Sequence, residues 1–311
     1  MNYRVVKAIV DDAQVVADLI NDHELTIDPE STPIGVSEAT ELLEGFFDPS
    51  LCAFLYTDDQ ELPGAFYSVN PDANRKRFFT DIYSRPNASL LREVLSESLK
   101  AAYELAPDYE QWFGVNSKDL EMKQVLESFG MQIIRTYWNM RLRLENASPG
   151  EISNPSVSIQ LIEDPVEMET FWKLNQDAFS GHFGFAPRAM DQWISMTLEA
   201  STFEKDGCFL AFYDGEPAGF VQLANANYHL NGGFVDLIGV AHRFQGLGLG
   251  QLLLQHAINV SIEQGRDFIE LNVDSGNESG ALRLYEKLGF KPNSAWEQYE
   301  NKKWAEVAKG L

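Results

Sequence analysis

A glycine-rich turn at residues 245–250 contains the residue pattern that points most directly to chemistry. The turn reads Gln245-Gly246-Leu247-Gly248-Leu249-Gly250 and has an apolar stretch on each side. Glycine permits positive φ angles and lets a ligand approach the backbone closely. The backbone N–H groups of such a turn, together with those of the helix N-terminus that follows, form an anion site suited to a pyrophosphate.

Other glycine motifs fit this turn less well. A dinucleotide-binding fingerprint requires glycine at the position of Gln251, and a P-loop requires a Lys-Ser/Thr pair that the segment lacks. The alternative without a ligand is a turn whose glycines only allow tight packing of a strand against a helix. Both interpretations therefore start from a strand, a turn and a helix in that order.

The turn resembles the Gln/Arg-x-x-Gly-x-Gly/Ala loop of the GCN5-related N-acetyltransferase (GNAT) superfamily, which also follows a β-strand. A second signature of that family is similar to Asn277-Glu278-Ser279-Gly280-Ala281-Leu282-Arg283-Leu284-Tyr285-Glu286-Lys287-Leu288-Gly289-Phe290. The resemblance is strong over residues 232–291 and weaker over residues 157–311. Two motifs in the same order and at a similar separation make it specific.

The resemblance implies that acetyl-CoA binds as co-substrate, without a metal. The pyrophosphate would lie on the backbone of residues 246–251, and the pantetheine arm would add like a strand beside residues 238–240. Asn277 would hydrogen-bond the cofactor arm. The expected contact residues are Ile238, Gly239, Val240, Gln245, Gly246, Leu247, Gly248, Leu249, Gly250, Gln251, Asn277 and Tyr285.

Acetyl transfer to an amine requires a neutral amine, a stabilised oxyanion and a protonated thiolate. The resemblance assigns the oxyanion to the backbone N–H of Val240. Tyr285 is the candidate general acid, and its alternative is a tyrosine packed on the sheet. Asp236 lies in an otherwise apolar strand, where desolvation would raise its pKa, and is the candidate base or water-orienting carboxylate. Its alternative is a solvated or backbone-bonded side chain.

Three further residues are candidates for lining the acceptor site. His182 lies in a loop after the first helix of this half, where an aromatic anchor is the alternative, and Tyr228 and His229 precede the Asp236 strand. The remaining histidines and the two cysteines, Cys52 and Cys208, show no metal-ligand spacing. The sequence contains no Gly-x-Ser-x-Gly elbow, so the motif does not support a Ser-His-Asp hydrolase.

The elements that must position these residues follow from hydrophobic periodicity. Strands are expected at residues 158–161, in a hairpin around Cys208, and at 233–240 and 267–273; helices are expected at 166–179, 189–198, 250–263 and 279–288. Gly289 supplies the helix stop. This order predicts a mixed α/β sheet, partly antiparallel and partly parallel.

An internal repeat extends the prediction to the first half of the chain. Leu51–Tyr67 and Cys208–Val221 both have the pattern of a β-hairpin, 79–83 matches 234–238, and 126–131 matches 285–290. The cysteine-to-aspartate spacing is 29 residues to Asp81 and 28 to Asp236. We therefore expect two tandem GNAT-like domains, each with a mixed sheet flanked by helices. The tandem arrangement is similar to that of the mycothiol synthase family.

The first copy lacks the cofactor features. No glycine stands in residues 84–92, and counting back from the matched glycines places Leu126 where Tyr285 is and Lys118 where Asn277 is. We expect a degenerate domain at 1–146 without the cofactor loop, a Pro/Gly/Ser/Asn-rich linker at 147–155, and an acetyl-CoA-binding domain at 156–311. The first domain would serve as a scaffold that walls the acceptor site.

Composition narrows the class of function. The chain has 311 residues and a formal net charge of −23, a field that repels nucleic acid. No apolar run approaches the roughly 18–20 residues of a membrane span, and the start lacks the apolar segment of a signal peptide. We expect a cytoplasmic N-acetyltransferase, monomeric or homodimeric, that acetylates the primary amine of a small molecule by direct attack in a ternary complex. The alternatives are an idle acyl-CoA sensor and a protein N-terminal or lysine acetyltransferase.

Overall fold

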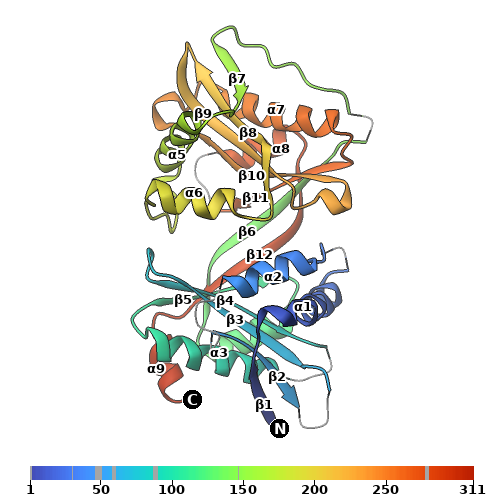
Figure 1. The fold of residues 1–311 in the computed structure, drawn as a ribbon, viewed down its shortest axis with the longest axis vertical. Helices are drawn as coiled ribbons and strands as arrows, with labels where there is room; N and C mark the ends of the chain where they lie inside the picture. The colour runs from blue at the N-terminus through green and yellow to red at the C-terminus, as the bar shows by residue number, and fades with distance from the viewer. Residues whose placement is uncertain are drawn as a thin grey trace. The chain divides into compact units, whose positions relative to one another are not determined.

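The chain folds into two compact units, seen in Figure 1. The computed structural model describes residues 2–29, 31–45, 51–57, 61–86, 90–145, 147–276 and 280–311. Unit 1 consists of residues Met1–Tyr137 with Ser294–Leu311, and unit 2 of Trp138–Asn293.

Unit 1 is a mixed sheet with helices on both faces. Its elements are β1 (Tyr3–Lys7), α1 (Ala13–Ile27), α2 (Val36–Glu44), β2 (Cys52–Thr57), β3 (Ala65–Asp72), β4 (Arg77–Ser84), α3 (Leu91–Leu105), β5 (Glu110–Asn116), α4 (Leu120–Ser128) and the first part of β6 (Gln132–Arg143), followed at the chain's end by β12 (Lys291–Glu300) and α9 (Trp304–Lys309). The strand order is β1-β2-β3-β4-β5-β12. Only the β4–β5 pairing is parallel.

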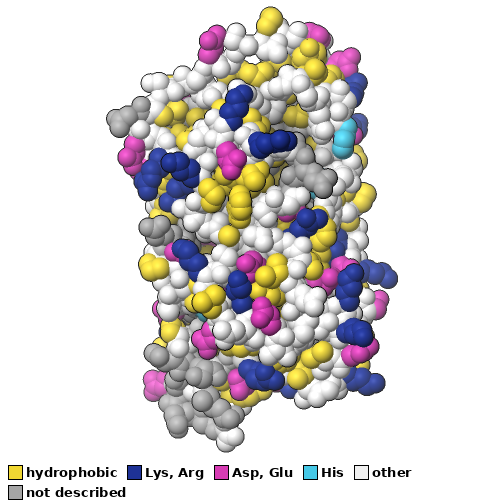
Figure 2. All heavy atoms as spheres, turned by 180° about the vertical axis from the view of Figure 1, so that it is seen from behind, with side chains coloured by type: hydrophobic (Ala, Val, Ile, Leu, Met, Phe, Trp, Pro, Cys, Tyr) yellow, Lys and Arg dark blue, Asp and Glu magenta, His cyan; other side chains and the backbone are white. Residues whose placement is uncertain are grey.

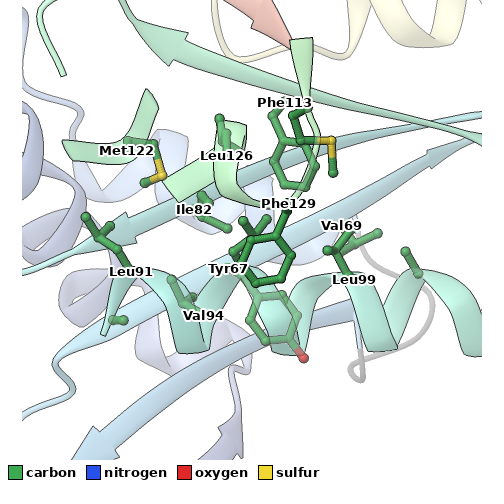
Figure 3. Packing of buried hydrophobic residues seen from close by; sticks show 14 of the residues in the cluster. Tyr67, Val69, Ile82, Leu91, Val94, Leu99, Phe113, Met122, Leu126 and Phe129 are labelled. Carbon is green, nitrogen blue, oxygen red and sulfur yellow. The ribbon is translucent and has the colours of Figure 1, made fainter. Parts of the chain in front are cut away.

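The main core of unit 1 lies between its sheet and the helices α3, α4 and α9 (Figure 3). Leu126 of α4 is fully buried in this core, to which Phe113 and Tyr67 also belong. A second core, on the opposite face, packs α1 and α2 against Phe54 and Phe66. Burial on both faces explains why the strands contain near-continuous apolar runs.

Unit 2 repeats this plan. Its elements are β7 (Val157–Leu161), α5 (Pro165–Phe179), α6 (Met190–Leu198), β8 (Phe203–Tyr213), β9 (Glu216–Ala224), β10 (Gly232–Val240), α7 (Leu249–Glu263), β11 (Phe268–Asp274) and α8 (Ala281–Lys287). The strand order is β7-β8-β9-β10-β11-β6, with β10 and β11 parallel. One core packs α7 and α8 on the sheet, and another packs α5 and α6 on the opposite face. The predicted tandem α/β fold is confirmed.

The two sheets exchange their last strands, so the division differs from the boundary expected at residues 147–155. The end of β6 belongs to unit 2, where Met140 is fully buried and Arg141 Nε lies 2.6 Å from the buried Glu270. The end of the chain belongs to unit 1: β12 pairs with β5, and Tyr299 and Trp304 lie in the unit 1 core. Hydrophobic periodicity predicts where a strand lies in the sequence but not which strand it pairs with. The exchange of β6 and β12 between the units could therefore not be predicted from the sequence.

The expected linker is held against α7. The N–H of Gly150 donates to Oδ1 of Asn259, and Nδ2 of Asn259 donates to the carbonyl of Gly150, both at 2.8 Å. A Cβ on Gly150 would lie 2.5 Å from the end of the Gln255 side chain, so a larger residue here would require that flexible side chain to move. No described helix is long and apolar enough to cross a bilayer. On the face shown in Figure 2, basic and acidic side chains are interspersed rather than gathered into one basic surface.

Candidate functional site: the glycine turn and the open edge of β10

The glycine turn forms an open cradle at the start of α7. Gly246 and Gly248 both have φ of +80°, a conformation that side chains rarely adopt, and Gly248 caps the helix. A Cβ built on either glycine would meet no atom within 4 Å, so the space above the turn is free of described protein atoms. Gly250 differs, because it lies inside the helix, where a built Cβ would make an ordinary contact with Leu284 at 3.5 Å. Gly246 and Gly248 therefore shape the turn, whereas the space around Gly250 would accept a small side chain.

The backbone donors of this turn are available to a ligand. The N–H groups of Gln251 and Leu252 reach the carbonyl of Gly248 at 3.1 and 3.3 Å. The first N–H groups of a helix have no intrahelical acceptor, and among the described residues none accepts from Gly246 through Gly250. The Gln245 side chain donates to the Val240 carbonyl at 3.3 Å and ties the turn to β10. That a diphosphate binds at this turn stays a prediction from the sequence.

The last residues of β10 have one edge that no described strand covers. Parallel pairing with β11 ends at Val235, whereas antiparallel pairing with β9 continues to Val240. The Ala241 N–H donates to the Ala218 carbonyl at 2.9 Å. Antiparallel pairs alternate, so Ile238 and Val240 direct their N–H and C=O groups away from β9, toward the uncovered edge. An extended ligand can hydrogen-bond there as an added strand.

Asp236 lies at a β-bulge in β10. The register with β9 shifts between Val235 and Leu237, which leaves Asp236 as the extra residue. Val235 packs in the α7–α8 core and Leu237 against the α5–α6 core, so the bulge changes which face the following side chains cover. The Asp236 side chain reaches solvent, yet the surrounding protein desolvates it enough to raise its pKa, as the sequence predicted. Nε2 of Gln222 donates to its Oδ2 at 3.4 Å.

Tyr285 is 6% exposed on α8. It packs in the core that includes Leu271 and Val273 and lies against Phe290 at 6.2 Å between ring centroids. Its hydroxyl has no hydrogen-bond partner in the described part of the chain, and burial raises its pKa to about 12. Tyr285 therefore stays a neutral donor throughout the physiological pH range.

The three candidate acceptor residues divide into two groups. His182 lies near Asp274, at the carboxyl end of β11, and its ring lies against that of Phe179 at 4.8 Å between centroids. Burial lowers the pKa of His182, although the charge of Asp274 opposes this. Tyr228 and His229 lie in a 3-10 turn that precedes the amino end of β10. Arg266 covers the ring of Tyr228 at 3.5 Å. This contact is structural, so the geometry gives the acceptor role of Tyr228 and His229 no support.

Two residues near these groups were not singled out from the sequence. Nζ of Lys287 lies 2.9 Å from Oε1 of Gln251, in the first turn of α7. Gln222 is 2% exposed and contacts Asp236. Lys287 lies within the second family signature, so its position there could have marked it as a candidate cofactor contact. No sequence pattern marks Gln222. Asn277, the expected contact of the cofactor arm, lies outside the described residues.

The described residues of unit 1 do not repeat these features. α3, the counterpart of α7, is capped by Leu90, a fully buried side chain, in place of Gly248. Leu126 takes the place of Tyr285 in the core, and Lys118 pairs with the buried Asp28 at 2.5 Å. Across the described ranges of both units, no group of three or more His, Cys, Asp or Glu side chains is arranged to hold a metal ion.

A protein-family model matches the part of the chain that contains this candidate site. Residues 168–290 match the acetyltransferase (GNAT) family, a range that contains β10, the glycine turn and Tyr285. The match covers most of unit 2, so the assignment from the turn and from residues 277–290 is confirmed.

Curated relatives point to one branch of the superfamily. A mycothiol acetyltransferase of Tsukamurella paurometabola is 28% identical over 54% of this chain and 60% of its own length. That of Thermomonospora curvata is 34% identical over 52% of this chain and 53% of its own. The chain thus spans little more than half the length of these relatives. That of Thermobifida fusca is 25% identical over 77% of this chain and 75% of its own.

Solved structures share the tandem fold. A GCN5-related N-acetyltransferase from Sphaerobacter thermophilus has a TM-score of 0.79 at 19% identity, over 96% of this chain and 95% of that chain. A tandem GNAT protein from the clavulanic acid biosynthesis pathway has a TM-score of 0.72 at 14% identity, over 96% and 98%. At these identities the likeness concerns the fold.

Proposed function

We propose that this protein is an acetyl-CoA-dependent N-acetyltransferase, whose unit 2 transfers an acetyl group to the primary amine of a small molecule in a ternary complex. The observation that supports this most strongly is the uncovered edge of β10, which lies between the glycine turn at one end and Asp236 at the other. This arrangement suits a long ligand with a diphosphate at one end and a reactive group near Asp236.

The residues that would hold acetyl-CoA fit its chemistry. The N–H groups of Gly246 through Gly250 can donate hydrogen bonds to a diphosphate, and Lys287 adds a cation beside them. The backbone groups of Ile238 and Val240 match the amides of the pantetheine arm. Acetyl-CoA supplies the acetyl group as a thioester.

The side chains around the uncovered edge can move the protons that the reaction requires. One proton leaves the acceptor ammonium to give the neutral amine, whose nitrogen attacks the thioester carbon. As the C–N bond forms and the C–S bond breaks, the nitrogen loses a second proton, which ends on the departing thiolate. Asp236 takes the first of these protons, directly or through water, because its raised pKa makes it a stronger base than an ordinary aspartate. The Val240 N–H points to the edge where the thioester oxygen would lie and can stabilise the oxyanion.

Tyr285 supports the departing sulfur as a hydrogen-bond donor. A thiol has a pKa near 8.5, whereas burial raises the pKa of Tyr285 to about 12. Complete transfer of the phenolic proton to the thiolate is therefore uphill in the free protein. The hydroxyl has no competing acceptor in the described residues, so it can stabilise developing charge on sulfur without ionising itself. We therefore propose that Tyr285 donates a hydrogen bond to the departing sulfur and does not transfer its proton completely.

Charge favours a cationic acceptor. The chain carries a formal net charge of −23, so its field favours an alkylammonium acceptor over an anionic one, while the glycine turn and Lys287 act locally on the cofactor phosphates. A small amine is the acceptor class that we propose, with His182 beside the carboxyl end of the sheet as a contact.

A turnover screen tests the proposal. The full chain is incubated with acetyl-CoA and a panel of amine metabolites, peptides with free N-termini, and lysine peptides, while release of free CoA thiol and acetylation of the amine are measured. We expect turnover with small amines and its loss in Asp236→Asn. Turnover only with peptides would indicate a protein acetyltransferase. Binding of acetyl-CoA without turnover of any amine would indicate a sensor.

A further inference from the structure

Gln222 is a buried polar side chain beside Asp236 with half of its amide unused. It lies on β9, is 2% exposed, and Nε2 is 3.4 Å from Oδ2 of Asp236. Oε1 is buried and has no hydrogen-bond partner among the described residues. Buried acceptors are nearly always paired, so an unpaired one beside a proposed base calls for an explanation.

The chemistry of Asp236 fixes the amide orientation. A carboxylate only accepts hydrogen bonds, so the amide nitrogen of Gln222 must face it and the oxygen must point elsewhere. The residue paired with Gln222 on β8, Cys208, cannot satisfy that oxygen, because its thiol points to the carbonyl of Glu204 at 3.9 Å. If Asp236 becomes protonated, its O–H becomes a donor, and a rotated amide could accept from it.

We propose that Gln222 is a positioning residue that holds Asp236 in the bulge and rotates its amide as Asp236 gains and loses a proton. This rests on the proposed function, in which the ammonium proton of the acceptor moves to Asp236. With the carboxylate, Nε2 donates to Oδ2; with the carboxylic acid, Oε1 accepts from the acid O–H. Asp236 thus keeps a hydrogen-bond partner in both protonation states. Only the hydrogen bonds of Gln222 change, and its covalent bonds stay intact.

The other titratable groups around Asp236 are few. On β8, the Cys208 thiol lies near Asp236, and burial raises the pKa of this thiol to about 12, so it stays neutral. Glu204 on the same strand also lies near that thiol. On β11, Glu270 is paired with Arg141 at 2.6 Å. Burial is the cause that raises the pKa of Asp236, and Gln222 opposes it by donating to the charged form.

Unit 1 offers an internal comparison. There, Cys52 pairs with Ser68, and Ser68 pairs with Asp81, in an uninterrupted β2–β3–β4 register. Ser68 thus takes the position in unit 1 that Gln222 takes in unit 2. The register of β4 is continuous at Asp81, so the bulge at Asp236 has no counterpart there. The long amide therefore occurs in the unit that has the glycine turn.

Two substitutions test the proposal on the full chain. Gln222→Met keeps the side-chain length, and Gln222→Leu serves as a second variant if the first folds poorly. The control is Gln111→Leu, which removes another buried glutamine with an unpaired Oε1, on β5 in unit 1. Thermal unfolding and acetyl-CoA affinity are measured for each variant to verify folding.

The deciding measurement is the carboxyl titration of Asp236 by ¹³C NMR, with Asp236→Asn used to assign its signal. Because the hydrogen bond to the carboxylate is stronger than the one to the neutral acid, we expect Gln222→Met to raise the titration midpoint by about half a pH unit, roughly a threefold change in proton affinity. The acidic limb of kcat/KM should move with it, while Gln111→Leu changes neither. In the wild type, the side-chain amide signals of Gln222 should shift as Asp236 titrates. An unchanged Asp236 midpoint in Gln222→Met, or amide signals of Gln222 that do not follow the titration, would overturn the proposal. Full turnover in Asp236→Asn would instead contradict the base role and leave the NMR result on Gln222 valid.

Discussion

Lys287 on α8 places its ammonium nitrogen 2.9 Å from the side-chain oxygen of Gln251, in the first turn of α7. The acceptor is neutral, and in the described part of the chain no carboxylate pairs with this lysine. A cation is thus held beside the helix N-terminus in a protein with a formal net charge of −23. Since both the helix end and the lysine attract anions, their effects on a bound diphosphate should add.

Replacing Lys287 by glutamine should weaken acetyl-CoA binding about 3- to 10-fold, which corresponds to roughly 1 kcal/mol for a partly exposed charge. The dependence of the dissociation constant on salt should become shallower. Isothermal titration at two ionic strengths measures both effects. The control is Lys173→Gln, an exposed lysine on α5 that is paired with Glu169 at 2.6 Å. Equal weakening in both variants would show a general charge effect, and titration with 3′-dephospho-CoA would show which phosphate Lys287 contacts.

Tyr285→Phe should reduce kcat by about 10² to 10³, the usual loss when one donor to a developing charge is removed. Folding and acetyl-CoA affinity should change little, because the ring stays in its core and the hydroxyl has no described partner. Tyr67→Phe, at a buried tyrosine of unit 1, is the control and should keep wild-type kcat. Chemistry-limited rates that are the same in Tyr285→Phe and the wild type would return Tyr285 to a packing role.

The stability of unit 1 should depend on the charge of His23. Nε2 of His23 lies 3.2 Å from Oδ2 of Asp119, and Nδ1 lies 3.0 Å from the carbonyl of Ser84. Burial alone would lower the pKa of His23, but these two contacts outweigh it and raise the pKa above its ordinary value near 6.5. Their stabilisation is therefore present below about pH 6.5 and is lost as the pH rises through the raised pKa.

Asp119→Asn isolates this contribution. Asp119 also caps α4 by accepting from the Met122 N–H at 2.9 Å, and the asparagine oxygen can keep that bond. Urea unfolding at pH 5.5 and pH 8 should show that the wild type loses about 1 kcal/mol more stability than the variant over this interval. An equal pH dependence in both proteins would mean that His23 is not charged in the fold.

Sequence reasoning located the parts of the site that depend on local pattern. The glycine turn, the helix after it and the stop at Gly289 are encoded within short segments, because φ preference and hydrophobic period act locally. The raised pKa of Asp236 was also predictable, since an acid in an apolar strand is desolvated. Its place in a bulge was not, because a shift in register depends on the neighbouring strand.

Contacts between distant segments account for the rest. Lys287 and Gln251 are 36 residues apart, and Gln222 and Asp236 meet only because β9 pairs with β10. The exchange of β6 and β12 also depends on contacts between distant segments. The sequence around Trp304, for example, does not indicate that this residue packs in the core of unit 1. Tyr228 was grouped with the acceptor site by its place before β10, yet it lies at the amino end of that strand.

The central claim is that acetyl-CoA binds at the glycine turn of unit 2, and equilibrium titration of the full chain with acetyl-CoA tests it most directly. We predict one site per chain, and its loss in Gly248→Glu, where a carboxylate would stand among the backbone N–H groups and at a φ of +80° that side chains rarely adopt. Two equivalent sites per chain, or unchanged binding in a folded Gly248→Glu variant, would contradict the claim.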